Sequence, residues 1–66
     1  MNRLELNTEI YSVEHILQTC EVYKNLAEIR ARKKKGKIIL IFEKCRYECS
    51  ITMKEFENYL INIENI

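Results

Sequence analysis

The residues best suited to chemistry in this sequence are three cysteines and one histidine. Cys45 and Cys49 lie four positions apart, and His15 and Cys20 precede them. Together these side chains could supply four ligands of the zinc type. In a strand, however, the Cα atoms of Cys45 and Cys49 would be about 13 Å apart, too far for one ion unless the strand bends. On a helix, His15 and Cys20 would point about 140° apart. We therefore predict no metal site and no cofactor, with Cys20 packed in the core.

Nucleophilic or acid–base catalysis is not predicted either. His15 falls in the first turn of an expected helix, and the spacing places no Ser or Cys as its partner. The glutamates are spread along polar faces, where solvated surface is the ordinary interpretation. We therefore expect a chain that is not an enzyme.

A second chemical feature is a dense basic segment in a chain whose formal net charge is only +1. Six cationic residues fall within eight positions: Arg30, Arg32, Lys33, Lys34, Lys35 and Lys37. Such a cluster could contact phosphates. No aromatic residue is interleaved with the charges, and lysines at a hairpin also protect sheet edges and aid solubility. A small nucleic-acid-binding domain is thus the alternative function.

The length and composition limit the remaining possibilities. The 66 residues contain no Pro and one Gly, which predicts a single ordered domain over residues 1–66. The longest apolar run, Ile38–Phe42, is far shorter than the ~20 residues of a membrane helix. An odd number of cysteines does not make a closed disulfide framework, and no signal peptide is evident. We expect a cytoplasmic protein without a membrane segment.

Hydrophobic spacing predicts the elements in the first half of the chain. Alternation predicts strands over residues 3–6 and 27–32, and Ser12 caps a helix between them. Tyr11 and Ile16 occupy the hydrophobic-staple positions of this helix. Its core arc is expected to contain Val13, Ile16, Leu17, Cys20, Tyr23 and Ala27.

In the second half, a turn at residues 34–36 leads to a strand at 38–42, which is apolar on both faces and so central in the sheet. Alternation of Cys45, Tyr47 and Cys49 predicts that this strand continues or bends into a short separate one. The predicted fold is therefore α+β: a β-α-β-β-α module with a three-stranded, mainly antiparallel sheet and two helices on one face.

The last helix is expected to start with a capping box. Thr52 would be the N-cap and Glu55 the N3 residue, with Ile51 and Phe56 as the staple. This phase predicts a buried arc of Met53, Phe56, Tyr59, Leu60, Ile63 and Ile66. It turns Asn58 outward with Ile61 beside it. Asn in a helix interior costs a few tenths of a kcal/mol relative to Ala, so an outward Asn58 indicates a partner surface.

Three segments also resemble a known family. Residues 10–14 (IYSVE), 23–27 (YKNLA) and 55–60 (EFENYL) are similar in order and spacing to the HxsD-like proteins of the His-Xaa-Ser peptide system. The resemblance implies a small non-catalytic accessory protein that presents a precursor peptide to a radical-SAM maturation enzyme. Tyr11, Phe56, Asn58 and Tyr59 match the motif positions, whereas the run Lys33–Lys35 departs from them.

The partner predicted from these features is a protein or peptide, with a radical-SAM enzyme as the partner that the resemblance implies. Self-association is a further option, and nucleic acid is less favoured. The partner-binding residues expected on this basis are Asn58, Ile61, Tyr11 and Tyr59.

Overall fold

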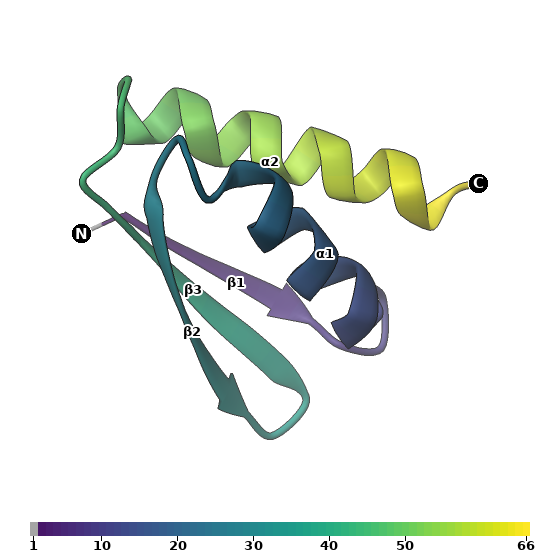
Figure 1. Ribbon diagram of the computed structural model, residues 1–66. Coiled ribbons are helices and arrows are strands. Elements are labelled where there is room, and N and C mark those ends of the chain that lie inside the picture. Colours follow the sequence, from purple (N-terminus) through teal and green to yellow (C-terminus); the bar gives the residue numbers. More distant parts are fainter. Residues whose placement is uncertain (1) are drawn as a thin grey trace.

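The computed structural model describes residues 2–66 as a three-stranded sheet with two helices on one face (Figure 1). The elements, in chain order, are β1 (Arg3–Asn7), α1 (Val13–Tyr23), β2 (Glu28–Lys34), β3 (Lys37–Glu43) and α2 (Cys49–Glu64). The strand order is β1-β3-β2, and β3 pairs antiparallel with both neighbours. The predicted α+β fold and the central position of β3 are confirmed.

The β2–β3 hairpin turns at the only glycine. Lys34 pairs with Lys37, which leaves Lys35 and Gly36 as a two-residue loop. Gly36 has φ +77°, a conformation that a residue without Cβ adopts at little cost. The predicted turn is therefore confirmed, and it carries the basic segment at the far end of the sheet.

The core lies between the sheet and the helices. Ile38, Leu40 and Phe42 of β3 point to the helical face and pack with Phe56 and Leu60 of α2 in one buried cluster. The rings of Phe42 and Phe56 meet edge to face, with centroids 5.4 Å apart. This cluster anchors α2 to the middle of the sheet.

Among residues 2–66, no helix covers the opposite face of the sheet, yet Ile39 at its centre is only 3% exposed. The cross-strand neighbours of Ile39 on this face are Glu5 and Arg32. Long charged side chains cover apolar surface with their aliphatic stems while their charged ends stay in water. Ion pairs hold several of these side chains in place, including Lys37 to Glu5 at 2.9 Å.

The predicted capping box of α2 is wrong, because the helix begins one turn earlier. Glu48 is the N-cap residue and makes no side-chain capping hydrogen bond. Thr52 lies inside the helix, is 2% exposed, and donates its hydroxyl to the Glu48 carbonyl at 3.3 Å. Ile51 is 52% exposed and does not act as a staple.

The predicted continuation of β3 through residues 45–49 is also wrong. The strand ends at Glu43, and Lys44 adopts φ +49°, which turns the chain away from the sheet. The loop then brings Cys45 within 5.3 Å of Cys49, Cα to Cα, and the two form a disulfide. The distance of about 13 Å expected for a strand does not apply, because the chain folds back into α2.

The core face of α1 differs from the predicted arc in two residues. Leu17 is 54% exposed, whereas Thr19 is fully buried and donates its hydroxyl to the His15 carbonyl at 2.8 Å. Because α1 packs against α2 as well as the sheet, its buried face is rotated toward Thr19. Ile66 is likewise fully exposed rather than part of the α2 core arc, whereas Asn58 and Ile61 face outward as predicted.

Candidate functional site

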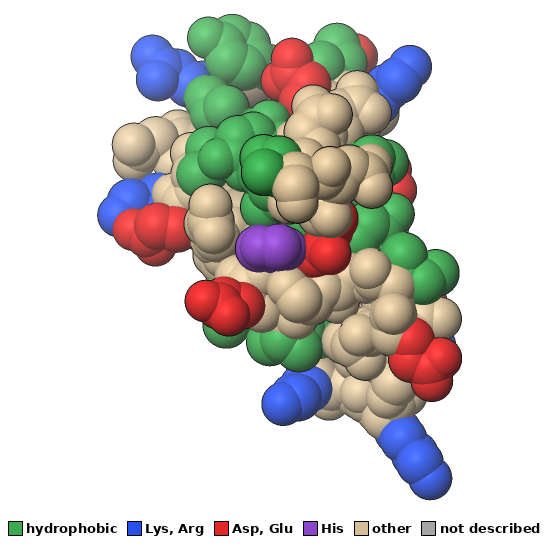
Figure 2. All heavy atoms as spheres, turned by 90° about the vertical axis from the view of Figure 1, so that its right-hand side faces the viewer, with side chains coloured by type: hydrophobic (Ala, Val, Ile, Leu, Met, Phe, Trp, Pro, Cys, Tyr) green, Lys and Arg blue, Asp and Glu red, His purple; other side chains and the backbone are tan. Residues whose placement is uncertain are grey.

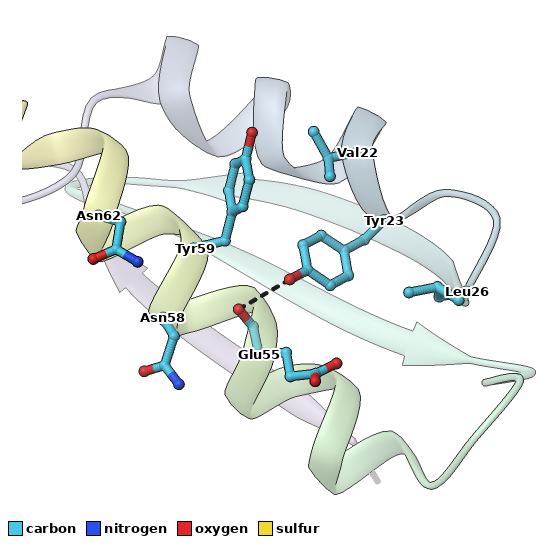
Figure 3. Close-up of a pocket in the computed structure, with 7 residues that line it drawn as sticks. All are labelled: Val22, Tyr23, Leu26, Glu55, Asn58, Tyr59 and Asn62. Carbon is cyan, nitrogen blue, oxygen red and sulfur yellow. Dashed lines mark hydrogen bonds between the residues drawn. The ribbon is translucent and has the colours of Figure 1, made fainter.

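A shallow, open concave surface that includes two predicted site residues, Asn58 and Tyr59, lies between α1 and α2. We call it the α1–α2 hollow; its volume is about 490 Å³. Figure 3 shows it in close-up, with side chains from the end of α1, the loop after it and the middle of α2. The lining residues are Val22, Tyr23, Leu26, Glu55, Asn58, Tyr59 and Asn62.

Two tyrosines form the aromatic part of this hollow. The Tyr23 hydroxyl donates a hydrogen bond to the Glu55 carbonyl at 3.1 Å, which joins the end of α1 to α2 (Figure 3). The Tyr23 and Tyr59 rings meet edge to face at 6.0 Å. Burial raises the pKa of the Tyr23 phenol, and the neighbouring Glu55 and Tyr59 raise it further. The phenol therefore stays a neutral hydrogen-bond donor.

The polar groups of the hollow come from one exposed face of α2. Asn58 and Asn62 are four residues apart and so lie one above the other on the helix. Figure 3 shows both amides at the outer rim, pointing away from the tyrosine rings. Each amide can donate and accept hydrogen bonds. Val22, which is 49% exposed, supplies apolar surface on the α1 side.

The structure divides the four predicted partner-binding residues between two places. Asn58 and Tyr59 line the α1–α2 hollow, whereas Tyr11 and Ile61 line a second hollow with Ile10, Glu64 and Asn65. Tyr23, Glu55 and Asn62 were missed as site residues. Helical spacing from Asn58 would have indicated Glu55 and Asn62, but no local pattern shows that Tyr23 reaches α2.

Beside the second hollow, Ser12, His15 and Glu64 come together. The Glu64 carboxylate accepts from the Ser12 backbone N–H and lies against His15 Nδ1, each at 2.7 Å. In Figure 2 the purple histidine touches red acidic atoms at this end of the molecule, next to green apolar side chains. These are the residue types of a Ser-His-acid triad, a grouping that the spacing along the chain does not predict.

The geometry of these three residues is nevertheless that of a helix cap. The Ser12 Oγ accepts from the His15 backbone N–H at 3.1 Å, which confirms Ser12 as the N-cap of α1. Within residues 2–66, no hydrogen bond joins this hydroxyl to the imidazole. In a capping box the N3 side chain satisfies the N-cap N–H. Here N3 is His15, and Glu64 performs that role from α2.

The Glu64 cap predicts acid sensitivity of the fold. The hydrogen bond from the Ser12 N–H, with that from His15, holds the pKa of Glu64 below its usual value of 4.5. The folded chain therefore binds fewer protons than the unfolded chain in this range. The stabilisation is complete above pH 4.5 and is lost as the pH falls through the lowered pKa. Glu64→Gln should thus show a shallower decrease of Tm than the wild type between about pH 6 and pH 3.

Thermal unfolding followed by circular dichroism across that pH range measures this effect. Glu9→Gln is the matched control, because Glu9 is exposed, lies outside both helices and forms no ion pair with any residue of the described chain. It should retain the pH dependence of the wild type. Equal slopes for Glu64→Gln and the wild type would rule out a stabilising cap by Glu64.

The basic hairpin is partly neutralised within the chain. Arg30 pairs with Glu43 at 2.8 Å and Lys37 with Glu5. The remaining cationic side chains are exposed and form no ion pair within the described residues; they are Arg32, Lys33, Lys34 and Lys35. In Figure 2, blue side chains project from the lower end of the molecule, where the hairpin turns.

The cysteines and histidine do not assemble into a metal centre in the described chain. Within residues 2–66, no group of three or more His, Cys, Asp or Glu side chains is placed to hold an ion. Cys20 is half-buried against the core cluster, and burial raises the pKa of its thiol. Its core position agrees with the prediction, whereas Cys45 and Cys49 serve as a covalent link between the end of β3 and α2.

Comparison with known proteins gives no relative from which to assign this site. The chain matches no protein-family model, no curated protein and no solved structure. The likeness to HxsD-like proteins thus stays a prediction from three short motifs. Neither of the two described helices is long and apolar enough to cross a membrane.

Proposed function

We propose that this protein is a non-catalytic accessory protein that holds an extended peptide segment of a partner in the α1–α2 hollow. The observation that carries this proposal is the hollow itself, where two outward amides stand beside apolar and aromatic surface. The HxsD-like resemblance supports the same class and suggests a precursor peptide or its radical-SAM maturation enzyme as the partner. We propose the cytoplasm as the compartment; this rests on the family resemblance, whereas the Cys45–Cys49 disulfide is of a kind more common outside the reducing cytosol.

The chemistry of the hollow suits an extended peptide in particular. An extended segment has backbone N–H and C=O groups that its own structure does not satisfy, and side-chain amides can pair with both. Asn58 and Asn62 make no side-chain hydrogen bond to another described residue, so their amides are free for a ligand. Tyrosine adds large contact area at low entropic cost, as it does in antibody binding loops.

Selection from a library of random peptides displayed on phage tests the proposal, because it requires no assumption about the sequence of the partner. The selected peptides are synthesised with a fluorescent label, and their affinity is measured by anisotropy. We expect Asn58→Ala to weaken binding about fivefold, the value of roughly one hydrogen bond. The fold should be kept, because Ala is the better helix former.

Asn65→Ala provides the matched control. It makes the same chemical change at the end of the same helix but lies in the second hollow, with Ile61. Binding should stay within about twofold of the wild type. If Asn65→Ala weakens binding and Asn58→Ala does not, the site is the second hollow and the proposal is wrong.

The unpaired charges of the hairpin favour a second candidate function, nucleic-acid binding. Four cationic side chains at a two-residue turn attract phosphates, and such contacts weaken steeply with salt. The turn is flanked by charged rather than aromatic residues, so base stacking does not add to the affinity. Titration of a labelled single-stranded DNA at several salt concentrations decides the matter, and no binding at low salt would eliminate this function.

A further inference from the structure

We propose that the α1–α2 hollow selects a peptide that presents a lysine or arginine side chain, with the Glu55 carboxylate as its counter-charge. This inference rests on the proposed function and specifies its ligand. It follows from the one formal charge that lines the hollow and from the aromatic surface beside that charge.

Glu55 is the only carboxylic acid among the lining residues of the hollow, and within residues 2–66 it has no ion-pair partner. Many of the other acids are already paired. Glu5, Glu21, Glu28 and Glu43 each pair with a lysine or arginine, and Glu64 lies against His15. A carboxylate left free in a concave site can therefore form a new pair with an incoming cation.

The position of Glu55 places this charge where a ligand would meet it. Its side chain leaves α2 on the side of Leu26, next to the Tyr23 ring (Figure 3). Its negative charge acts on the Tyr23 phenol and helps to raise the pKa of that group. The carboxylate is thus solvent-exposed at the edge of the hollow, close enough to the tyrosines for its charge to act on Tyr23.

Two aromatic rings strengthen the preference for a cation. Tyr23 and Tyr59 line the hollow together, and an ammonium or guanidinium group over the face of a tyrosine is attracted by the ring. The hydrocarbon stem of lysine or arginine can contact Val22 and Leu26 on the α1 side, as long side chains do elsewhere. One ligand side chain can use all three kinds of surface.

The charges of the molecule disfavour an acidic ligand here. No cationic residue lines the hollow itself. Within residues 2–66, the cations without an ion pair are four at the β2–β3 turn, far from α2 in Figure 1, together with Arg46 before α2 and Lys54 on it. An acidic peptide in the hollow would meet a carboxylate and no lining cation, and the hairpin would attract it elsewhere.

The test uses a peptide selected on the wild-type protein and a variant of that peptide in which each lysine and arginine is replaced by glutamine. Replacement should weaken binding about two- to fivefold, the range of an exposed ion pair. Glu55→Gln should weaken the original peptide to the same extent and leave the glutamine peptide unchanged. Each affinity is measured by fluorescence anisotropy at low and high salt.

Glu57→Gln is the matched control. It makes the same change two positions away on α2, and Glu57 does not line the hollow. The affinity of the Glu57→Gln variant for the cationic peptide should equal that of the wild-type protein. Equal losses with Glu55→Gln and Glu57→Gln would indicate non-specific attraction and overturn the inference.

The outcomes also separate this inference from the proposed function. A peptide that binds in the hollow, is weakened by Asn58→Ala, and tolerates both Glu55→Gln and loss of its cations would leave the proposed function intact and overturn the cation preference. Peptide binding that is insensitive to Asn58→Ala and to Glu55→Gln would overturn both. If the ligand proves to be the basic hairpin of a second copy, the protein will self-associate without peptide, which overturns the peptide assignment.

Discussion

Phe56→Ala is expected to unfold this protein at ordinary temperature. Removal of a buried phenylalanine side chain costs about 3–5 kcal/mol. A single core in a domain of this size supplies about 3–5 kcal/mol in total. The substitution should therefore abolish the cooperative thermal transition that the wild type shows by circular dichroism.

The position of Phe56 explains why so much depends on it. The side chain is fully buried. The centroid of its ring lies 5.4 Å from that of Phe42 in β3 and 5.6 Å from that of Tyr23 in α1. It thereby joins the sheet and both helices. No other aromatic pair described in the structure connects the sheet to a helix.

Leu17→Ala is the control, because it also shortens a large apolar side chain on a helix. Leu17 is half exposed, and its loss should change the free energy of unfolding by less than about 1 kcal/mol. Hydrophobic spacing alone predicts both residues in the core. If Leu17→Ala were as damaging as Phe56→Ala, the rotation of α1 described above would be wrong.

Thr52→Asp is expected to destabilise the protein by about 3–5 kcal/mol, because it places an unpaired carboxylate in a buried position. Thr52 is inside α2 and almost without solvent exposure. If Thr52 were instead the N-cap residue, Asp would serve at least as well as Thr there. The two starting points of α2 therefore predict opposite results for one substitution.

Urea unfolding measures the free energy for Thr52→Asp and for its counterpart, Glu48→Asp. Glu48 occupies the N-cap position but makes no capping hydrogen bond. A shorter aspartate there should stabilise the protein by up to about 1 kcal/mol. A stable Thr52→Asp together with an unchanged Glu48→Asp would show that α2 begins where the capping-box pattern places it.

The phase of α2 could be predicted although its start could not. Apolar side chains at helical spacing determine which face is buried, so Phe56 and Leu60 face inward and Asn58 faces outward whichever residue caps the helix. The start depends on the chain before it. A capping box at Thr52 is locally attractive, but the helix begins at Cys49, the residue bonded to Cys45, and so contains an additional turn.

The loop before α2 could not be predicted because its pattern imitates a strand. The apolar side chains alternate with charged ones, at Cys45, Tyr47 and Cys49. Lys44 nevertheless takes a positive φ, and the residues after it pair with no strand of the sheet. The loop is held by a contact with a distant part of the chain, since the Arg46 N–H donates to the Leu26 carbonyl at 2.7 Å. Single-residue patterns carry no information about such a contact.

The candidate site was predictable only in part for a similar reason. Asn58 stands out because it is a poor helix residue on an exposed face. The grouping of Asn58 with Tyr23, and the separation of both from Ile61, depend on how α1 crosses α2. That crossing is supported by bonds between residues far apart in the chain, such as Ser12 to Glu64.

The most direct test of the proposed function is the location of a bound peptide, found by NMR. The backbone and side-chain amide resonances of the labelled protein are recorded during titration with a peptide selected on it. We predict the largest shift changes at Glu55, Asn58 and Asn62, including both asparagine side-chain amides, with little change at the β2–β3 turn. Shift changes centred on Ile61 and Tyr11, or on residues 32–35, with the α1–α2 hollow unaffected, would contradict the proposed function.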